Sequence, residues 1–224
     1  AKSIPRPNWN DIEMGEFVER AQRSLRELDP NREYLNSRGL GSCIRWARLG
    51  WENGWIVVPI YSPNETLQGA VARAGPWREK GPMKFDMPYG QKPLLYVPRW
   101  DYWEAQERVF VVFGIFDALS LAVAGFAGSS PTAGKGSLDV KWFDKIDKPI
   151  FIIPDRGEDK EAHEYATKLD WRGRVCKLEY NTDEKDVNDI LVRRGPEGLK
   201  NAVESGERGG VRIRDERTAG FTWD

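Results

Sequence analysis

Acidic side chains follow three predicted strands of the chain, close to the point where each strand ends. Each strand is predicted from a run of mostly apolar residues, at 109–113, 149–153 and 174–180. The acids that follow them are Asp117, then Asp155, Glu158 and Asp159, and then Asp186 and Asp189. Because ligands of open α/β sheets collect at the carboxyl ends of the strands, we expect these carboxylates to lie along one edge.

Carboxylates that converge at one edge repel one another unless a cation lies between them. Hard oxygen ligands at this density suit Mg²⁺ or Mn²⁺. Such an ion neutralises phosphate charge during phosphoryl or nucleotidyl transfer. A second interpretation is that the acids only cap the helices that follow, since negative charge is favourable at a helix N-terminus. Acidic clusters after three successive strands favour the metal site.

Basic and aromatic residues are interleaved upstream of these acids. Between residues 38 and 99 there are nine basic residues and four acids. Six tryptophans lie in or just after this stretch, Trp46, Trp51, Trp55, Trp77, Trp100 and Trp103. This pattern is typical of single-stranded nucleic-acid sites, which neutralise phosphates and stack bases. Alternatively, the tryptophans are core residues and the charges a solvated rim, which is the interpretation that composition alone favours.

Composition also excludes several classes of protein. The 224 residues include two cysteines and one histidine, too few for a zinc ribbon or a disulfide scaffold. No apolar run approaches the roughly 18 residues of a membrane span, and no signal-peptide pattern stands at the N-terminus. Basic and acidic residues nearly cancel, at 34 and 35. We expect a cytoplasmic globular protein without zinc.

Two parts with different patterns must position the acids. In the first part, the apolar spacing predicts helices at 11–28 and 31–38 and a β-hairpin from 55–61 and 66–73. Residues 74–93, rich in Gly, Pro and charge, are expected to form a loop, and 94–97 one more strand.

In the second part, apolar strands alternate with helices. Helices are predicted at 115–124, 139–146, 158–169, 186–194 and 196–205. This alternation predicts an α/β protein with a doubly wound, mostly parallel sheet. We place a basic α+β subdomain at 1–106, the parallel-sheet domain at 107–205 and a flexible tail at 206–224.

A glycine-rich turn at 128–136 comes close to a phosphate-binding P-loop. It has five residues between the glycines where the P-loop has four, and Gly136 follows Lys135 where Ser or Thr is required. We do not interpret it as a P-loop. Its glycines allow close backbone approach, for example to a phosphate beside the acids.

The order of these elements resembles that of a Toprim domain. It runs from an apolar strand through Gly-x-x-Asp-Ala-Leu-Ser-Leu at 114–121 and a second strand with an acidic end to Lys-Asp-x-Asn-Asp at 185–189. Upstream, the motifs within 34–73 and the pair Lys84-Phe85 resemble the N-terminal subdomain of the DnaG-type primase polymerase core. The similarity covers residues 34–195.

The resemblance implies a fold, a chemistry and a set of site residues. The fold is a Toprim-like, mostly parallel sheet flanked by helices and preceded by a smaller α+β subdomain. Asp117 and Asp155 match the catalytic acids of the family, and Glu158 or Asp159 would supply a further carboxylate to Mg²⁺ or Mn²⁺. The residues expected to bind nucleic acid or nucleotide are Arg38, Arg73, Arg78, Lys84, Lys185, Asp186, Asn188 and Asp189.

Two departures from the family pattern leave two functions open. The glutamate that ends the first strand of the family is Phe113 here, which can neither exchange a proton nor bind a hard cation. The second acidic motif has a different spacing. One interpretation is a compact, phage- or plasmid-like primase, a nucleotidyltransferase that uses single-stranded DNA, NTPs and Mg²⁺ or Mn²⁺. The other is a catalytically degenerate DNA-binding module that acts as a replication accessory or initiation protein. A replicative helicase or polymerase is the expected protein partner of either.

Overall fold

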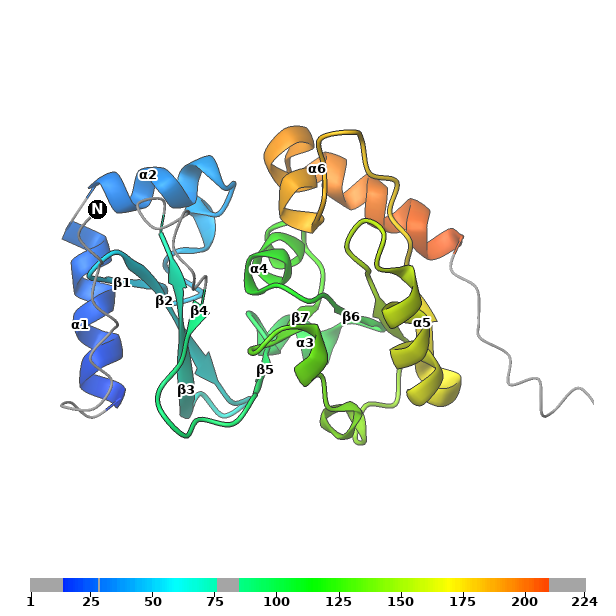
Figure 1. Ribbon diagram of the computed structural model, residues 1–224, viewed down its shortest axis with the longest axis horizontal. Helices are drawn as coiled ribbons and strands as arrows, with labels where there is room; N and C mark the ends of the chain where they lie inside the picture. The colour runs from blue at the N-terminus through cyan, green and yellow to red at the C-terminus, as the bar shows by residue number, and fades with distance from the viewer. Residues whose placement is uncertain (1–13, 28, 76–84, 210–224) are drawn as a thin grey trace, which may run out of the picture.

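The computed structural model describes residues 14–27, 29–75 and 85–209. Within them the chain forms two sheets that lie side by side, each with its own helices (Figure 1). Among the described residues, no helix is both long enough and apolar enough to cross a membrane.

The first sheet is antiparallel, with strand order β1-β2-β3-β4. Its elements are α1 (Met14–Glu27), α2 (Asp29–Ser37), the 3₁₀ turn η1 (Gly41–Cys43), β1 (Gly50–Glu52), β2 (Trp55–Tyr61), β3 (Leu67–Ala74) and β4 (Phe85–Asp86). Val57 and Ala70 pack against α1, which covers the outer face of this sheet. The alternate residues Val58 and Val71 face the second sheet, as the period of a strand requires.

The second sheet has strand order β5-β7-β6-β8-β9 and is parallel except for the edge strand β5. Its strands are β5 (Leu95–Tyr96), β6 (Val109–Val111), β7 (Gly128–Pro131), β8 (Ile150–Ile152) and β9 (Gly173–Val175). Its helices are α3 (Trp100–Ala105), α4 (Ile115–Val123), α5 (Asp159–Lys168) and α6 (Val187–Arg208), with 3₁₀ turns η3 (Lys135–Ser137), η4 (Val140–Phe143) and η5 (Asp170–Arg172).

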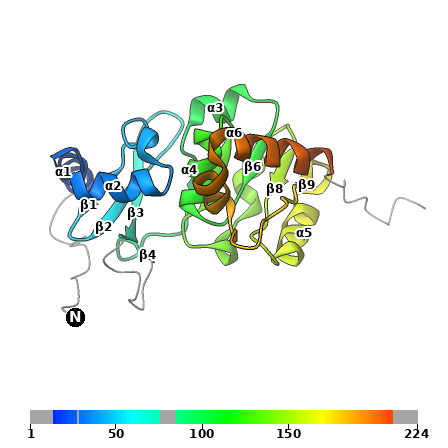
Figure 2. The ribbon, with the colours of Figure 1, turned by 90° about the horizontal axis from the view of Figure 1, so that it is seen from above.

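Helices cover both faces of the second sheet (Figure 2). Val109 and Val111 of β6 face the core that contains α5, while Phe110 faces the core that contains α4 and α6. Burial on both faces explains why the central strands are continuous apolar runs. The core on the α4 side continues to Val58 of the first sheet, so the two sheets share one hydrophobic core.

The α/β class and the mostly parallel sheet are confirmed, as are the hairpin and the first two helices within the described residues. The expected loop at 74–93 is wrong at β4, where Phe85 and Asp86 pair with β3. A two-residue strand is too short to show a period of its own. The helix expected at 139–146 is only the 3₁₀ turn η4, and α6 runs through both predicted helices, with a non-helical Gly195 (φ 70°) between them.

The predicted ends of the chain are tested only in part. α6 continues to Arg208, into the expected flexible tail, and residues 210–224 lie outside the described residues. The proposed boundary at residues 106 and 107 stays a prediction. Strand β5, which precedes it, pairs with β7 of the second sheet.

Candidate functional site

Asp117 lies in the first turn of α4, directly after the carboxyl end of β6. Its side chain is buried, and its Oδ1 accepts a hydrogen bond of 2.8 Å from the backbone N–H of Asn188. The carboxylate lies close against the backbone of Gly114. A Cβ at position 114 would lie only 2.1 Å from Asp117 Oδ2, so a larger residue there would collide with the carboxylate. The turn between strand and helix thus fixes this carboxylate.

Asp186 is the N-cap of α6, and its Oδ1 accepts a hydrogen bond of 2.8 Å from the backbone N–H of Asp189. The Asp189 carboxylate in turn accepts a 3.1 Å bond from the N–H of Lys185, whose side chain is exposed. Capping therefore accounts for part of the role of these acids, as the alternative interpretation expected.

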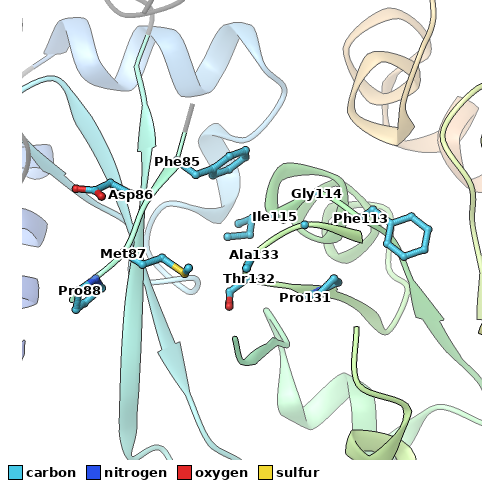
Figure 3. A pocket seen from close by; sticks show the side chains of 11 residues that line it. Phe85, Asp86, Met87, Pro88, Phe113, Gly114, Ile115, Pro131, Thr132 and Ala133 are labelled. Atoms are coloured by element: carbon cyan, nitrogen blue, oxygen red, sulfur yellow. The ribbon is translucent and has the colours of Figure 1, made fainter. Parts of the chain in front are cut away.

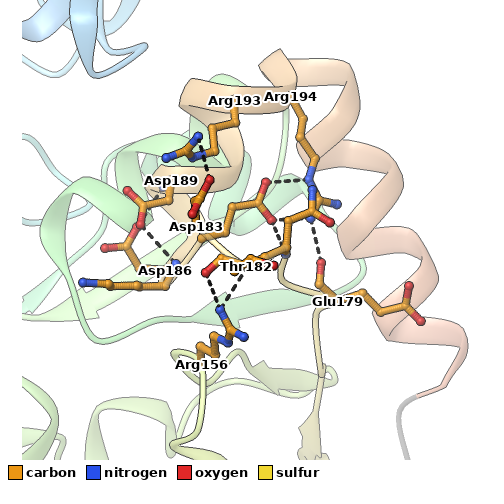
Figure 4. Close-up of polar contacts among 11 residues, drawn as sticks. Arg156, Glu179, Thr182, Asp183, Asp186, Asp189, Arg193 and Arg194 are labelled. Carbon is orange, nitrogen blue, oxygen red and sulfur yellow. Dashed lines mark hydrogen bonds and ion pairs between the residues drawn. The ribbon is translucent and has the colours of Figure 1, made fainter.

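The loop that carries Asp186 is held by polar contacts on its other side (Figure 4). Arg194 forms an ion pair with the buried Glu184, with Nε 2.7 Å from Oε1. The Arg156 guanidinium donates to the carbonyl oxygens of Thr182 and Asn181 at 2.7 and 3.1 Å. These contacts tie the segment after β8 to the segment before α6.

Asp117, Asp155 and Asp186 are linked by their charges, and we call them the carboxylate rim. Burial, with Asp186 and Asp155 next in importance, raises the pKa of Asp117 well above its usual range. Burial, Asp186 and Glu158 raise the pKa of Asp155 to about 7. The pKa of Asp186 is also raised, chiefly by burial. Asp155 and Asp186 therefore lie within electrostatic reach of Asp117, and Asp186 within reach of Asp155.

Tyr180 gives a second indication that the rim converges. Its hydroxyl donates to the carbonyl oxygen of Pro154 at 2.8 Å. Burial raises the pKa of Tyr180, and all three rim carboxylates raise it further. One hydroxyl group is thus within electrostatic reach of all three acids.

Two arginines of the first part face the rim. Arg73 of β3 opposes the raised pKa of both Asp117 and Asp186, and Arg38 that of Asp186. The Arg73 guanidinium lies 3.9 Å from the centre of the Phe116 ring and donates a 2.8 Å bond to the Tyr34 hydroxyl. Arg73 is therefore pre-oriented toward the acids by one residue from each part of the chain.

Asn188 joins the two parts. Its side-chain Nδ2 donates to the carbonyl oxygen of Arg38 and to Ser120 Oγ, both at 2.9 Å, while its N–H holds Asp117. Asn188 is buried, so losing these bonds would leave polar groups without partners. Its position thus marks it as a residue that positions the rim.

Glu158 and Asp159, the two alternatives for a further metal ligand, are both paired with lysines. Lys135 Nζ lies 2.9 Å from Glu158 and 3.3 Å from Glu161, and Lys177 Nζ lies 2.9 Å from Asp159. The charge of Glu158 still reaches Asp155, whose pKa it raises. The sequence did not reveal the role of Lys135, because its partners Glu158 and Glu161 follow it in the chain only after β8.

The remaining predicted nucleic-acid-binding residues and tryptophans do not lie at the carboxylate rim or are outside the described residues. Arg78, Lys84 and Trp77 lie outside the described residues. Trp51, Trp55 and Trp103 are buried in the cores, so the core interpretation holds for them, and Trp46 and Trp100 are half-buried.

No protein-family model and no curated protein sequence matches the chain. Solved structures match it: the Aquifex aeolicus primase (zinc-binding and RNA polymerase domains) has a TM-score of 0.66 at 17% identity over 89% of this chain and 63% of that one. The E. coli primase catalytic core has 0.64 at 17% over 88% and 79%. A DnaG primase catalytic domain bound to single-stranded DNA has 0.65 at 15% over 88% and 77%.

The chain has the fold of the DnaG primase catalytic core. At these identities the likeness shows the fold. The chain spans less than two thirds of the Aquifex structure.

Phe113 lies two residues after β6, at the place where the primase pattern has a glutamate, and its side chain is half-buried. It packs against Tyr165 of α5, with ring centres 5.9 Å apart, and the Tyr165 hydroxyl donates to the carbonyl oxygen of Lys135 at 2.7 Å. We call Phe113, Lys135, Glu158, Glu161 and Tyr165 the lysine corner. The lysine corner thus combines an apolar ring contact with a lysine that is paired with two glutamates.

The primase fold implies a divalent ion, and the donor chemistry of the rim fits one. Three carboxylates whose pKa values are raised, chiefly by burial, carry negative charge that a cation would balance when they are ionised. In the parts of the chain that the structure describes, however, no three His, Cys, Asp or Glu side chains are close enough to hold one ion. The rim therefore supplies suitable ligands that lie apart from one another.

Proposed function

We propose that this chain is a primase-like protein of DNA replication that binds single-stranded DNA and nucleotides and synthesises short primers with Mg²⁺ or Mn²⁺. The observation that supports the proposal is the carboxylate rim facing Arg38 and Arg73. Carboxylates for a cation and guanidinium groups for phosphates are the parts that nucleotidyl transfer needs on one face.

In this proposal an ion binds at the carboxylate rim and would neutralise phosphate charge when bound. Asp117, Asp155 and Asp186 would have to move closer together to hold it, because in this structure they lie apart. Arg73 and Arg38 bind phosphate oxygens of template or nucleotide. Because Arg73 is already stacked on Phe116 and bonded to Tyr34, it loses little freedom when a phosphate arrives. Asn188 keeps Asp117 in place.

Primer synthesis on single-stranded template with Mg²⁺ and with Mn²⁺ tests the proposal. The unmodified chain should make short products, and Asp155→Asn should lower the rate by roughly 10²–10⁴, the contribution typical of a catalytic group. Asp159→Asn is the matched control, because Asp159 pairs with Lys177. Absence of product from the unmodified chain with either metal would contradict the enzyme.

A second candidate function is a binding module without catalysis, acting as an accessory or initiation protein of replication. The packing of Phe113 on Tyr165 favours it, since position 113 carries a phenyl ring in place of a carboxylate. Phe113→Glu discriminates between the two functions in the same assay. If the variant gains synthesis that the unmodified chain lacks, the chain in its native form is the binding module.

Both functions require single-stranded DNA to contact Arg73. We predict that binding of an oligonucleotide weakens steeply between about 50 and 200 mM salt. Arg73→Ala should lower the slope of log K against log salt by about 0.7. Arg99→Ala is the control, because Arg99 pairs with Asp101 at 3.0 Å. A slope equal in both variants would exclude Arg73 from the DNA contact.

A further inference from the structure

A cavity of about 440 Å³ lies between the two sheets, and its walls are mostly apolar (Figure 3). Phe85, Met87 and Pro88, on β4 and directly after it, form one wall. The other wall comes from the ends of β6 and β7 and the start of α4, with Gly114, Ile115, Pro131, Thr132 and Ala133. None of the side chains in these walls belongs to the carboxylate rim.

The cavity nevertheless adjoins the rim. Gly114 lines it, and the same residue lies directly against the Asp117 carboxylate. On the opposite wall, Phe85 is the antiparallel strand partner of Arg73. Side chains of such partners project on the same side of a sheet, with Cβ atoms about 5 Å apart. A ligand whose phosphates lie between Arg73 and the rim therefore has its remaining part beside Phe85.

The walls suit a flat, weakly polar ring. Phe85 is 43% exposed, although a phenyl ring gains free energy when it is covered. Figure 3 shows Phe85 and Met87 extending from the first sheet toward Ile115 and Thr132. A thioether makes favourable contacts with aromatic rings. The Thr132 hydroxyl accepts a 2.9 Å bond from the N–H of Leu94 and keeps its own proton for donation to a polar ring edge.

We propose that this cavity binds a nucleobase, which stacks against Phe85 while the phosphates of the same nucleotide lie at Arg73. The inference rests on the proposed function for the phosphates and adds to it the place of the base. The base can come from a free nucleoside triphosphate or from a DNA strand, and the test distinguishes these two sources.

Met87 provides a site-specific signal. The chain has three methionines, Met14, Met83 and Met87, so a ¹³C-methyl spectrum is simple to assign with Met87→Leu. ATP, adenosine, inorganic tripolyphosphate and an oligothymidylate are added in turn to the full-length protein in Mg²⁺. We expect ATP and adenosine to shift the Met87 methyl signal through the ring current of the base, and tripolyphosphate to leave it in place. A shift with the oligothymidylate assigns the cavity to a base of the DNA strand as well.

Affinity supplies the second measurement. Stacking on an aromatic side chain predicts that Phe85→Ala weakens ATP binding roughly 10-fold and leaves tripolyphosphate binding unchanged. Phe85→Leu, which keeps an apolar side chain, should show most of the same loss. Tyr89→Ala is the matched control, because Tyr89 follows the same segment, is 97% exposed and does not line the cavity.

The outcomes separate this inference from the proposed function. If tripolyphosphate binds but ATP binds no more tightly and Met87 does not move, the nucleobase site is overturned and the phosphate site stands. If adenosine shifts Met87 while tripolyphosphate does not bind, the nucleobase site stands and the proposed phosphate site fails. If neither ligand has an effect, both are overturned.

Discussion

The carboxylate rim and the lysine corner lie at the same edge of one sheet and differ in how their charge is balanced. In the rim, Asp186 and Asp155 raise the pKa of Asp117, and Asp186 raises the pKa of Asp155. Arg73 opposes the raised pKa of Asp117 and, with Arg38, that of Asp186, while Lys135 opposes that of Asp155. In the corner, Lys135 pairs directly with Glu158 and Glu161. The difference teaches that an added cation is expected to bind at the carboxylate rim. In the lysine corner, Lys135 already balances the charge of the glutamates.

The largest expected effect is a change in stability when Asp117, the buried acid of the rim, is neutralised. Asp117→Asn keeps an oxygen that can accept the Asn188 N–H and removes a buried, repelled charge. We expect the free energy of unfolding at pH 8, without metal, to rise by about 1–3 kcal/mol. Chemical denaturation measures it. Added Mn²⁺ should then stabilise the native chain more than the variant.

The control for Asp117→Asn is Glu161→Gln in the lysine corner, which removes a charge that Lys135 already balances. It should give no gain in stability. A destabilised Asp117→Asn variant, or an equal response of both variants to Mn²⁺, would contradict the contrast between the two sides.

The second effect is a dependence of stability on pH. The pKa of Asp155 is about 7 in the folded chain and about 4 when unfolded, so the folded state binds this proton more tightly. Stability from this group is therefore present below pH 4 and is lost as the pH rises to about 7. Because the carboxyl is partly exposed, we expect about 2 kcal/mol, roughly half of what the full shift would give.

Asp155→Asn isolates this term. The difference in unfolding free energy between native chain and variant, measured at pH 4.5 and pH 8, should move against the native chain as the pH rises. A difference that stays constant over this range would mean that Asp155 titrates as an ordinary carboxyl.

The smallest effect comes from the lysine corner. Lys135 lowers the pKa of Asp155, so Lys135→Met should raise that pKa further. NMR titration of the ¹³C-labelled carboxyl groups measures the midpoint. Lys177→Met, which removes the partner of Asp159, is the control and should leave the midpoint unchanged. A fall of the midpoint in Lys135→Met would show that Lys135 acts on Asp155 only through local structure.

The sequence could predict the parts of the site that depend on regular elements. Apolar runs located β6 and β8. The rule that ligands gather at strand carboxyl ends predicted that Asp117, Asp155 and Asp186 lie near one another, and in the structure Asp155 and Asp186 raise the pKa of Asp117. The spacing of turn residues located the β2–β3 hairpin.

It could not predict contacts between residues far apart in the chain. Asn188 bonds the carbonyl of Arg38, and Lys135 pairs with Glu158, and neither contact has a local pattern. The two-residue strand β4 carries Phe85 to the cavity without any alternation of its own. From composition Trp55 and Trp103 could be stacking residues, and only the structure shows that both are buried.

The most direct test of the account is a Mn²⁺ titration of the full chain followed by electron paramagnetic resonance, repeated with Asp155→Asn and Asp159→Asn. We predict one bound ion, an affinity at least about 100-fold lower in Asp155→Asn, and no change in Asp159→Asn. Equal binding in the native chain and Asp155→Asn would contradict the claim that the carboxylate rim is a cation site.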